Sequence, residues 1–158
     1  MEPENPAENV KNRGNVEFKN KNFKGAIELY EEAIQINPDE PLYYNNKAAA
    51  YIEIGEYESA LIELNKAEQL FEEGKVKDFV KKAKVLARRA SVLNHQGKYE
   101  EAIVFYEKSL MEDGVQKVRD ELKIVKKHLK EKEAKEYLNP ELAEKACETG
   151  NALFKEGI

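Results

Sequence analysis

The chain has 158 residues, of which 41% are hydrophobic and 36% charged, and its net charge is -5 at pH 7. This acidic balance argues against nucleic acid as the partner, because phosphate binding requires a basic surface. The single cysteine excludes an internal disulfide, and no run of about 18 apolar residues is present to span a membrane. We therefore expect a cytoplasmic protein that contacts neither membrane nor nucleic acid.

Residues 1–7 contain no apolar run and are expected to form a disordered leader. Further along, three segments share one pattern, namely an aromatic residue, two variable residues, an alanine and then apolar residues at helical spacing. The alanines of this pattern are Ala26, Ala60 and Ala102, which lie 34 and 42 residues apart. The longer interval equals the shorter one plus an insertion of eight residues, which we place near residues 73–78.

Another helix is expected before each of these segments, joined to it by a short polar turn at residues 19–22, 55–56 or 97–98. Small residues recur where the two helices of a pair must approach closely, since a larger side chain would force the helices apart. They are Gly14, Ala26, Ala33, Ala48, Ala60, Ala67, Ala90 and Ala102. The sequence therefore predicts an all-α protein built from helix pairs.

After the third pair, residues 115–137 carry apolar residues at helical spacing and are expected to cap the exposed end of the stack. Residues 138–158 read as a linker and a new helix, because Asn139 and Pro140 favour a helix start. The segment 149–154 echoes 13–18. We expect it to be the first helix of a following, truncated repeat domain in a larger protein.

This period of 34 residues, with paired helices and fixed small and aromatic positions, resembles the tetratricopeptide repeat over residues 8–112. The resemblance implies a right-handed α-α superhelix of three helix pairs, completed by the capping helix as a domain spanning residues 8–137. In such arrays the first helix of each pair lines the concave, ligand-binding face. An ordinary helix bundle with accidental periodicity is the alternative.

The predicted first helices carry a set of hydrogen-bond donors. Lys11 and Asn15 are four residues apart and share one helix face, as do Lys84 and Arg88, while Asn46 lies on the helix between them. Lysine, arginine and asparagine side chains together offer charged and neutral N–H groups, which suit carboxylates. These five residues are the candidate peptide-binding site.

By their positions within the repeats, these five residues resemble the two-carboxylate clamp of chaperone-binding tetratricopeptide domains. In that family the clamp holds peptides ending in Glu-Glu-Val-Asp. The resemblance implies that Lys11, Asn15 and Asn46 hold the terminal α-carboxylate. It also implies that Lys84 reaches the terminal aspartate side chain and that Arg88 contacts the peptide backbone or an upstream carbonyl.

The insertion, the capping helix and residues 137–143 resemble the middle repeat domain of the Hop/Sti-type organising co-chaperones. That resemblance implies that the ligand is the tail of heat-shock protein 90. It leaves open whether the tail of heat-shock protein 70 also binds. Four further residues are candidates for the groove wall. Phe18 stands where the family often has tyrosine, Ser91 stands where it often has asparagine, Lys81 would add positive charge, and Glu53 would lie beside Phe18.

No enzyme motif is present, and no cofactor is expected. His95 and His128 lack partners at metal-ligand spacing, and Cys147 lacks the histidine and asparagine that would make it a nucleophile. The leading hypothesis is a monomeric co-chaperone adaptor. The alternative is a generic repeat scaffold that binds an internal segment of another partner.

Overall fold

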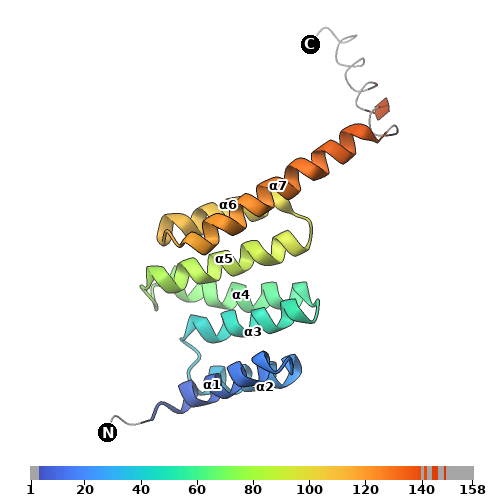
Figure 1. Cartoon of the computed structure of the whole chain (residues 1–158). Coiled ribbons are helices and arrows are strands. Elements are labelled where there is room, and N and C mark those ends of the chain that lie inside the picture. The colour runs from blue at the N-terminus through green and yellow to red at the C-terminus, as the bar shows by residue number, and fades with distance from the viewer. Residues whose placement is uncertain (1–3, 140, 142–143, 146–147, 149–158) are drawn as a thin grey trace.

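The computed structural model describes residues 4–139, 141, 144–145 and 148, which form seven helices and no strand (Figure 1). The helices are α1 (Pro6–Lys19), α2 (Phe23–Ile36), α3 (Pro41–Glu53), α4 (Tyr57–Glu72), α5 (Phe79–His95), α6 (Tyr99–Glu112) and α7 (Gln116–Leu138). They stack as three pairs, and α7 packs on α6 and extends past the stack. This arrangement confirms the predicted all-α repeat superhelix. None of the described helices combines the length and the apolar character that crossing a membrane requires.

The first helix begins earlier than the sequence suggested. The expected disordered leader of residues 1–7 is wrong for its last residues, because α1 starts at Pro6 and the Ala7 side chain is fully buried. Asn5 caps this helix, since its Oδ1 accepts hydrogen bonds from the backbone nitrogens of Ala7 and Glu8. Proline at the first helical position supports the same start.

The predicted turns inside the pairs are confirmed. Gly55 and Gly97 adopt positive φ angles of 78° and 74°, which glycine reaches without strain. Lys21 takes the equivalent place in the first pair with φ 62°. The predicted insertion corresponds to the loop between α4 and α5, at residues 73–78, and to longer helices on both sides of it. Helices α4 and α5 have 16 and 17 residues, whereas the other paired helices have 13 or 14.

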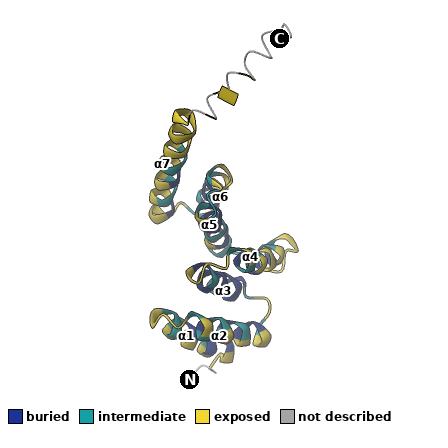
Figure 2. Cartoon of the chain, turned by 90° about the vertical axis from the view of Figure 1, so that its right-hand side faces the viewer, coloured by how far each residue is buried: buried dark blue, intermediate teal, exposed yellow. Residues whose placement is uncertain are grey.

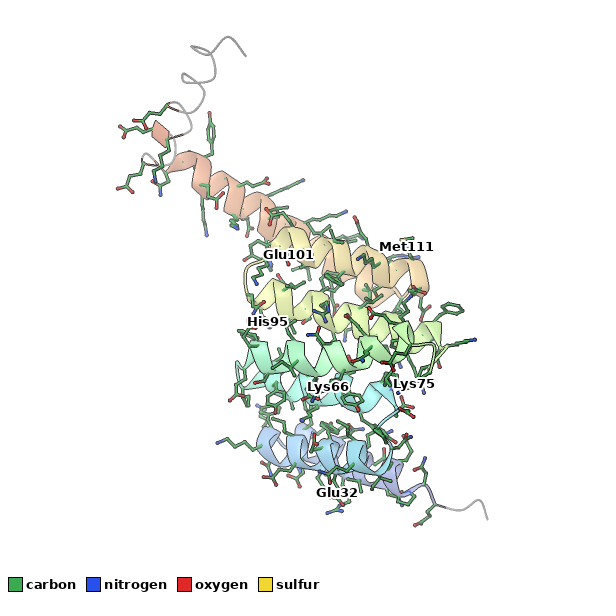
Figure 3. All side chains as sticks on the ribbon, turned by 180° about the vertical axis from the view of Figure 1, so that it is seen from behind. Glu32, Lys66, Lys75, His95, Glu101 and Met111 are labelled. Atoms are coloured by element: carbon green, nitrogen blue, oxygen red, sulfur yellow. The ribbon has the colours of Figure 1, made fainter. Side chains whose placement is uncertain are left out.

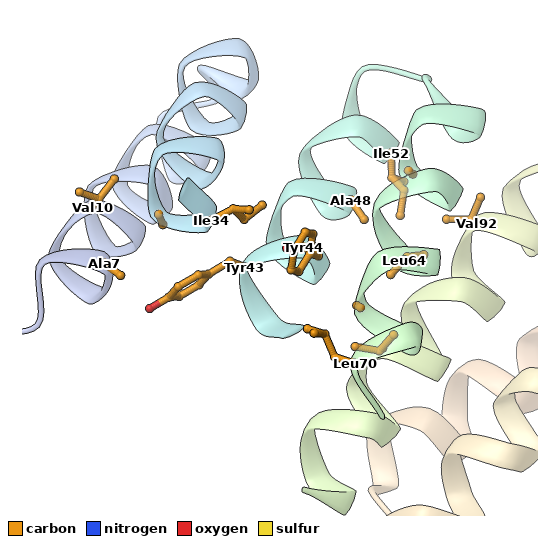
Figure 4. Close-up of a cluster of buried hydrophobic side chains, with 14 residues drawn as sticks. Ala7, Val10, Ile34, Tyr43, Tyr44, Ala48, Ile52, Leu64, Leu70 and Val92 are labelled. Atoms are coloured by element: carbon orange, nitrogen blue, oxygen red, sulfur yellow. The ribbon is translucent and has the colours of Figure 1, made fainter. Parts of the chain in front are cut away.

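The predicted close contacts between helices are also confirmed. All seven alanines predicted at these contacts are completely buried. Gly14 faces the ring of Tyr30, and a Cβ atom added at Gly14 would lie only 2.7 Å from Tyr30 Cε1. The core continues through the stack, where Tyr43 of α3 points toward Ala7 of α1 (Figure 4).

The capping helix α7 covers the third pair. Val118 and Val125 are buried against Ala102 and Tyr106 of α6, as the cap prediction requires. The helix ends at Leu138, one residue beyond the predicted end, and Asn139 is its C-cap. Apart from residues 138–139, 141, 144–145 and 148, the predicted linker and following repeat lie outside the described residues.

Candidate functional site

Helices α1, α3 and α5, the first of each pair, lie on one side of the stack together with α7, and the second helices lie on the other (Figure 2). A groove of about 390 Å³ opens between α3, α5 and the start of α7. Among the residues that line it are Asn46, Lys84, Arg88 and Ser91, so four of the nine predicted site residues share one groove. Helix α7 contributes the opposite wall through Lys117, Val118 and Glu121.

Arg88 lies deep in this groove. Burial lowers the pKa of its guanidinium, and the nearby carboxylates of Glu121 and Glu53 oppose that shift. Arginine stays charged under these conditions, because its pKa is far above neutral. Its Nε atom is buried and has no hydrogen-bond acceptor among the described residues.

Asn45 adds a second unsatisfied polar atom to the same groove. Its side chain is 4% exposed, and its Oδ1 atom is buried without a donor in the described part of the chain. A peptide group offers both a carbonyl acceptor and an N–H donor. Two residues that line the groove thus each carry a buried polar atom without a partner among the described residues.

On the α1 side, Asn15 is held by the core. The Tyr30 hydroxyl of α2 donates to Asn15 Oδ1 at 2.6 Å. Burial raises the pKa of Tyr30 to about 12, and the positive charge of Arg88 acts in the opposite direction. The Arg88 charge thus acts on the tyrosine that bonds Asn15, which couples the α1 and α5 parts of the candidate site electrostatically.

Lys11 and Lys81 each form an ion pair with a glutamate of the same chain. Lys11 Nζ lies 2.6 Å from Glu8 Oε2, and Lys81 Nζ lies 2.8 Å from Glu40 Oε2. Hydrogen bonds from Lys11 and Tyr43 lower the pKa of the Glu8 carboxyl. Lys81 was expected to add positive charge to the groove, but Glu40 balances its charge at short range.

The remaining candidate site residues differ in their exposure to solvent and in their contacts. Lys84 is exposed, and among the described residues no acidic side chain pairs with it. Phe18 packs its ring edge-on against Phe23, with centroids 5.2 Å apart. Ser91 lines the groove, and its side chain opposes the rise that burial causes in the pKa of Tyr106. Glu53 is exposed, and its charge reaches Arg88.

Five of the nine sequence-predicted residues do not line the groove that contains Asn46, Lys84 and Arg88, namely Lys11, Asn15, Phe18, Glu53 and Lys81. Lys11 is bonded to Glu8 and Asn15 to the Tyr30 hydroxyl, and the charges of Lys81 and Arg88 act on these two partners. The sequence reasoning missed Glu8, Asn45 and Glu121. The spacing of three residues between Glu8 and Lys11 was a usable signal. The position of Glu121 depends on how α7 docks, which spacing alone does not reveal.

A larger groove of about 690 Å³ lies elsewhere, between α4, α5, α6 and the loop at residues 73–78. Its walls are largely apolar, and Phe79 and Met111 are 67% and 85% exposed at its edge. Met111 appears at the end of α6 in the view from behind (Figure 3). None of the candidate clamp residues lines this groove.

Comparison with known proteins agrees with the repeat fold. A family profile described as "TPR repeat" matches residues 14–55, and one described as "Tetratricopeptide repeat" matches residues 42–73 and 83–114. The chain is 40% identical over 144 residues to the "Hsp70-Hsp90 organising protein" of Plasmodium falciparum, covering 90% of this chain and 25% of that protein. The chain thus spans about a quarter of the length of that relative.

Two solved structures are similar. One is the "TPR2AB-domain:pHSP90-complex of yeast Sti1", with TM-score 0.76 and 35% identity, covering 95% of this chain and 57% of that one. The other is the second TPR domain of human RPAP3 in complex with the HSP70 peptide SGPTIEEVD, with TM-score 0.62 and 31% identity, covering 76% and 94%. The chain belongs to the tetratricopeptide-repeat family and is a domain homologous to the Hsp70-Hsp90 organising proteins.

Proposed function

We propose that this domain binds the C-terminal Glu-Glu-Val-Asp tail of heat-shock protein 90 through a two-carboxylate clamp, with the heat-shock protein 70 tail as a second ligand. Lys11, Asn15 and Asn46 hold the terminal α-carboxylate. Lys84 binds the side chain of the terminal aspartate, and Arg88 donates to a backbone carbonyl. The HSP70 peptide SGPTIEEVD in the similar RPAP3 complex ends in these four residues.

The observation that carries this proposal is the composition of the groove beside Lys84. Arg88 Nε and Asn45 Oδ1 are both buried there without partners among the described residues, and a buried polar atom without a partner costs about 1–3 kcal/mol. An extended peptide satisfies both atoms with its own backbone once the two side chains turn toward it, since neither atom is open to solvent in the empty groove. The exposed ammonium of Lys84 then supplies a charged contact for a carboxylate.

The role that follows is that of an adaptor rather than a catalyst. The domain captures an exposed acidic tail and brings its carrier to the rest of the protein to which the domain belongs. A monomer suffices for this role, because all five clamp residues come from one chain. We place this activity in the cytoplasm, in agreement with the single cysteine of the sequence.

Calorimetric titration with two versions of one peptide tests the clamp. A free-acid peptide ending in Glu-Glu-Val-Asp is expected to bind with a dissociation constant near 1 μM, about -8 kcal/mol. The same peptide with an amidated C-terminus loses a charge-assisted contact and is expected to bind at least about 1.5 kcal/mol more weakly. Equal affinities for the two peptides would remove the clamp assignment.

The Lys84→Ala variant tests the residue that the proposal pairs with the aspartate side chain. It is expected to lose at least about 1.5 kcal/mol of binding free energy for the tails of both chaperones. Lys77→Ala is the matched control, because Lys77 is exposed, carries the same charge and lies outside the proposed clamp groove. The control is expected to bind as the wild type does.

The apolar groove beside Met111 favours a second candidate function, a scaffold that binds an internal segment of another protein. This function requires no free carboxylate. Amidation of the peptide, or the Lys84→Ala substitution, would then leave partner binding unchanged, whereas Phe79→Ser at the groove edge would weaken it. The two functions are thus separated by the same titrations.

A further inference from the structure

The carboxylate of Glu8 is fixed at the edge of the proposed clamp. Its Oε2 atom accepts from Lys11 Nζ at 2.6 Å, and its Oε1 atom accepts from the Tyr43 hydroxyl at 2.7 Å. Tyr43 is almost completely buried between α1 and α3, so it holds the carboxylate in place from a second helix. Glu8 is thus more firmly held than an ordinary surface residue paired along one helix.

The groups that face Glu8 come from three helices. Lys11 lies on its own helix and Tyr43 on α3, and the positive charge of Lys81 on α5 also acts on it. Lys81 is bound to Glu40, whereas Lys11 has no other acidic partner among the described residues. Glu8 therefore balances the charge of the one lysine that the clamp assigns to the terminal carboxylate.

This pairing has a direct consequence for a ligand. A peptide that places its α-carboxylate on Lys11 brings a second negative group to an ammonium that already binds one. The ammonium has three N–H donors, so it can contact both carboxylates, but the two negative charges then lie close together and repel each other. The peptide must either displace Glu8 from Lys11 or accept this repulsion.

We propose that Glu8 is an internal competitor of the ligand, which occupies Lys11 in the empty groove and sets the affinity of the clamp below the value that its cations alone would give. This inference rests on the proposed function of the clamp. The penalty applies to every carboxylate-terminated ligand. Because of this penalty, a peptide whose C-terminus contacts only Lys11 binds too weakly to fill the groove. A tail that also contacts Lys84 still binds, but it dissociates faster than it would without Glu8.

The test substitutes Glu8→Gln, which keeps the shape of the side chain and an oxygen for Tyr43 but removes the charge. The free-acid Glu-Glu-Val-Asp peptide is expected to bind about two- to fivefold more tightly to this variant, the range of a partly exposed ion pair. Glu32→Gln is the matched control. Glu32 is exposed on α2 on the opposite side of the stack (Figure 3), and its substitution changes net charge equally.

A double-mutant cycle shows whether Glu8 acts through Lys11. In a Lys11→Ala background, Glu8→Gln is expected to give no gain, because the competitor and the ligand no longer share an ammonium. A gain of the same size in both backgrounds would indicate a general charge effect and overturn the inference. Thermal denaturation of each variant checks that folding is intact.

Equal or weaker binding by Glu8→Gln would also overturn the inference, since Glu8 would then orient Lys11 for the ligand instead of competing with it. In that outcome the wild type still binds the free-acid peptide, and the proposed function stands. If the wild type itself fails to bind the peptide, both the clamp and the competitor are lost. The two failures are therefore distinguishable in one series of titrations.

Discussion

The Tyr30 hydroxyl of α2 donates a 2.6 Å hydrogen bond to Oδ1 of Asn15 on α1. Since the amide oxygen is engaged by the core, the two N–H groups of the same amide remain to donate to a ligand. Gly14 allows this contact, because any larger residue would place its Cβ against the Tyr30 ring. The packing of the first helix pair thus orients one of the proposed clamp residues.

Removing this hydroxyl is expected to weaken peptide binding. In Tyr30→Phe the Asn15 amide loses its fixed orientation, and we expect a loss of about 0.5–1.5 kcal/mol in calorimetric titration with the free-acid peptide. Tyr44→Phe is the control, because the Tyr44 hydroxyl donates to the carbonyl of Pro38, in the loop between α2 and α3. If both variants bind equally well, Asn15 does not depend on Tyr30.

The turn of the first helix pair is a site for stabilisation. Lys21 has a φ of 62°, where Gly55 and Gly97 occupy the equivalent turns. A side chain in this left-handed region costs about 1 kcal/mol relative to glycine, so Lys21→Gly is expected to raise the free energy of unfolding by about 0.5–1 kcal/mol. Lys24→Gly, within α2, is expected to lower it by about 1 kcal/mol. Urea denaturation measures both, and a destabilised Lys21→Gly would contradict the argument.

Two adjacent residues of α7 test whether the capping helix is part of the folded unit. Val125 is 1% exposed and packs in the core of the third pair, whereas Ile124 is 52% exposed. Val125→Ala is expected to lower the free energy of unfolding by about 2 kcal/mol, and Ile124→Ala by less than about 0.5 kcal/mol. Similar small effects in both variants would mean that α7 unfolds independently of the stack.

Buried tyrosines predict a loss of stability in alkali. Burial raises the pKa of Tyr30 to about 12, from 10.0 for the free side chain, and it also raises the pKa of Tyr43 and of Tyr106. The folded state therefore holds protons that the unfolded state releases above pH 10. The contribution of Tyr30 to stability is complete below pH 10 and is lost as the pH rises through about 12.

Urea denaturation at a series of pH values between 10 and 12 checks this expectation. The decline in the free energy of unfolding should be less steep in Tyr30→Phe than in the wild type. Tyr137→Phe is the control, because Tyr137 is 83% exposed on the projecting part of α7. An identical decline in all three proteins would show that the Tyr30 phenol ionises as readily in the folded chain as in the unfolded one.

The sequence by itself determined the order of the helices, the repeat period and the residues at close helix contacts. These features depend on local information. Turns such as the one at Gly55 and the periodic alanines of the second helices define each helix and its buried face, whatever its neighbours are. The start of α1 was missed, although Asn5 and Pro6 are themselves local signals of a helix start.

Only the tertiary structure decided which charges are balanced. The helical spacing predicted that Lys11 and Arg88 lie on the groove side, but it could not show that Glu121 from α7 lines the same groove as Arg88 and acts on its charge. Likewise, Lys47 is buried and bonded to Glu31 on α2 and Glu63 on α4, although its sequence gives no sign of burial. Periodicity fixes the direction of a side chain on its own helix. The partner that it meets there depends on how distant helices pack, and that packing sets the charge of the groove.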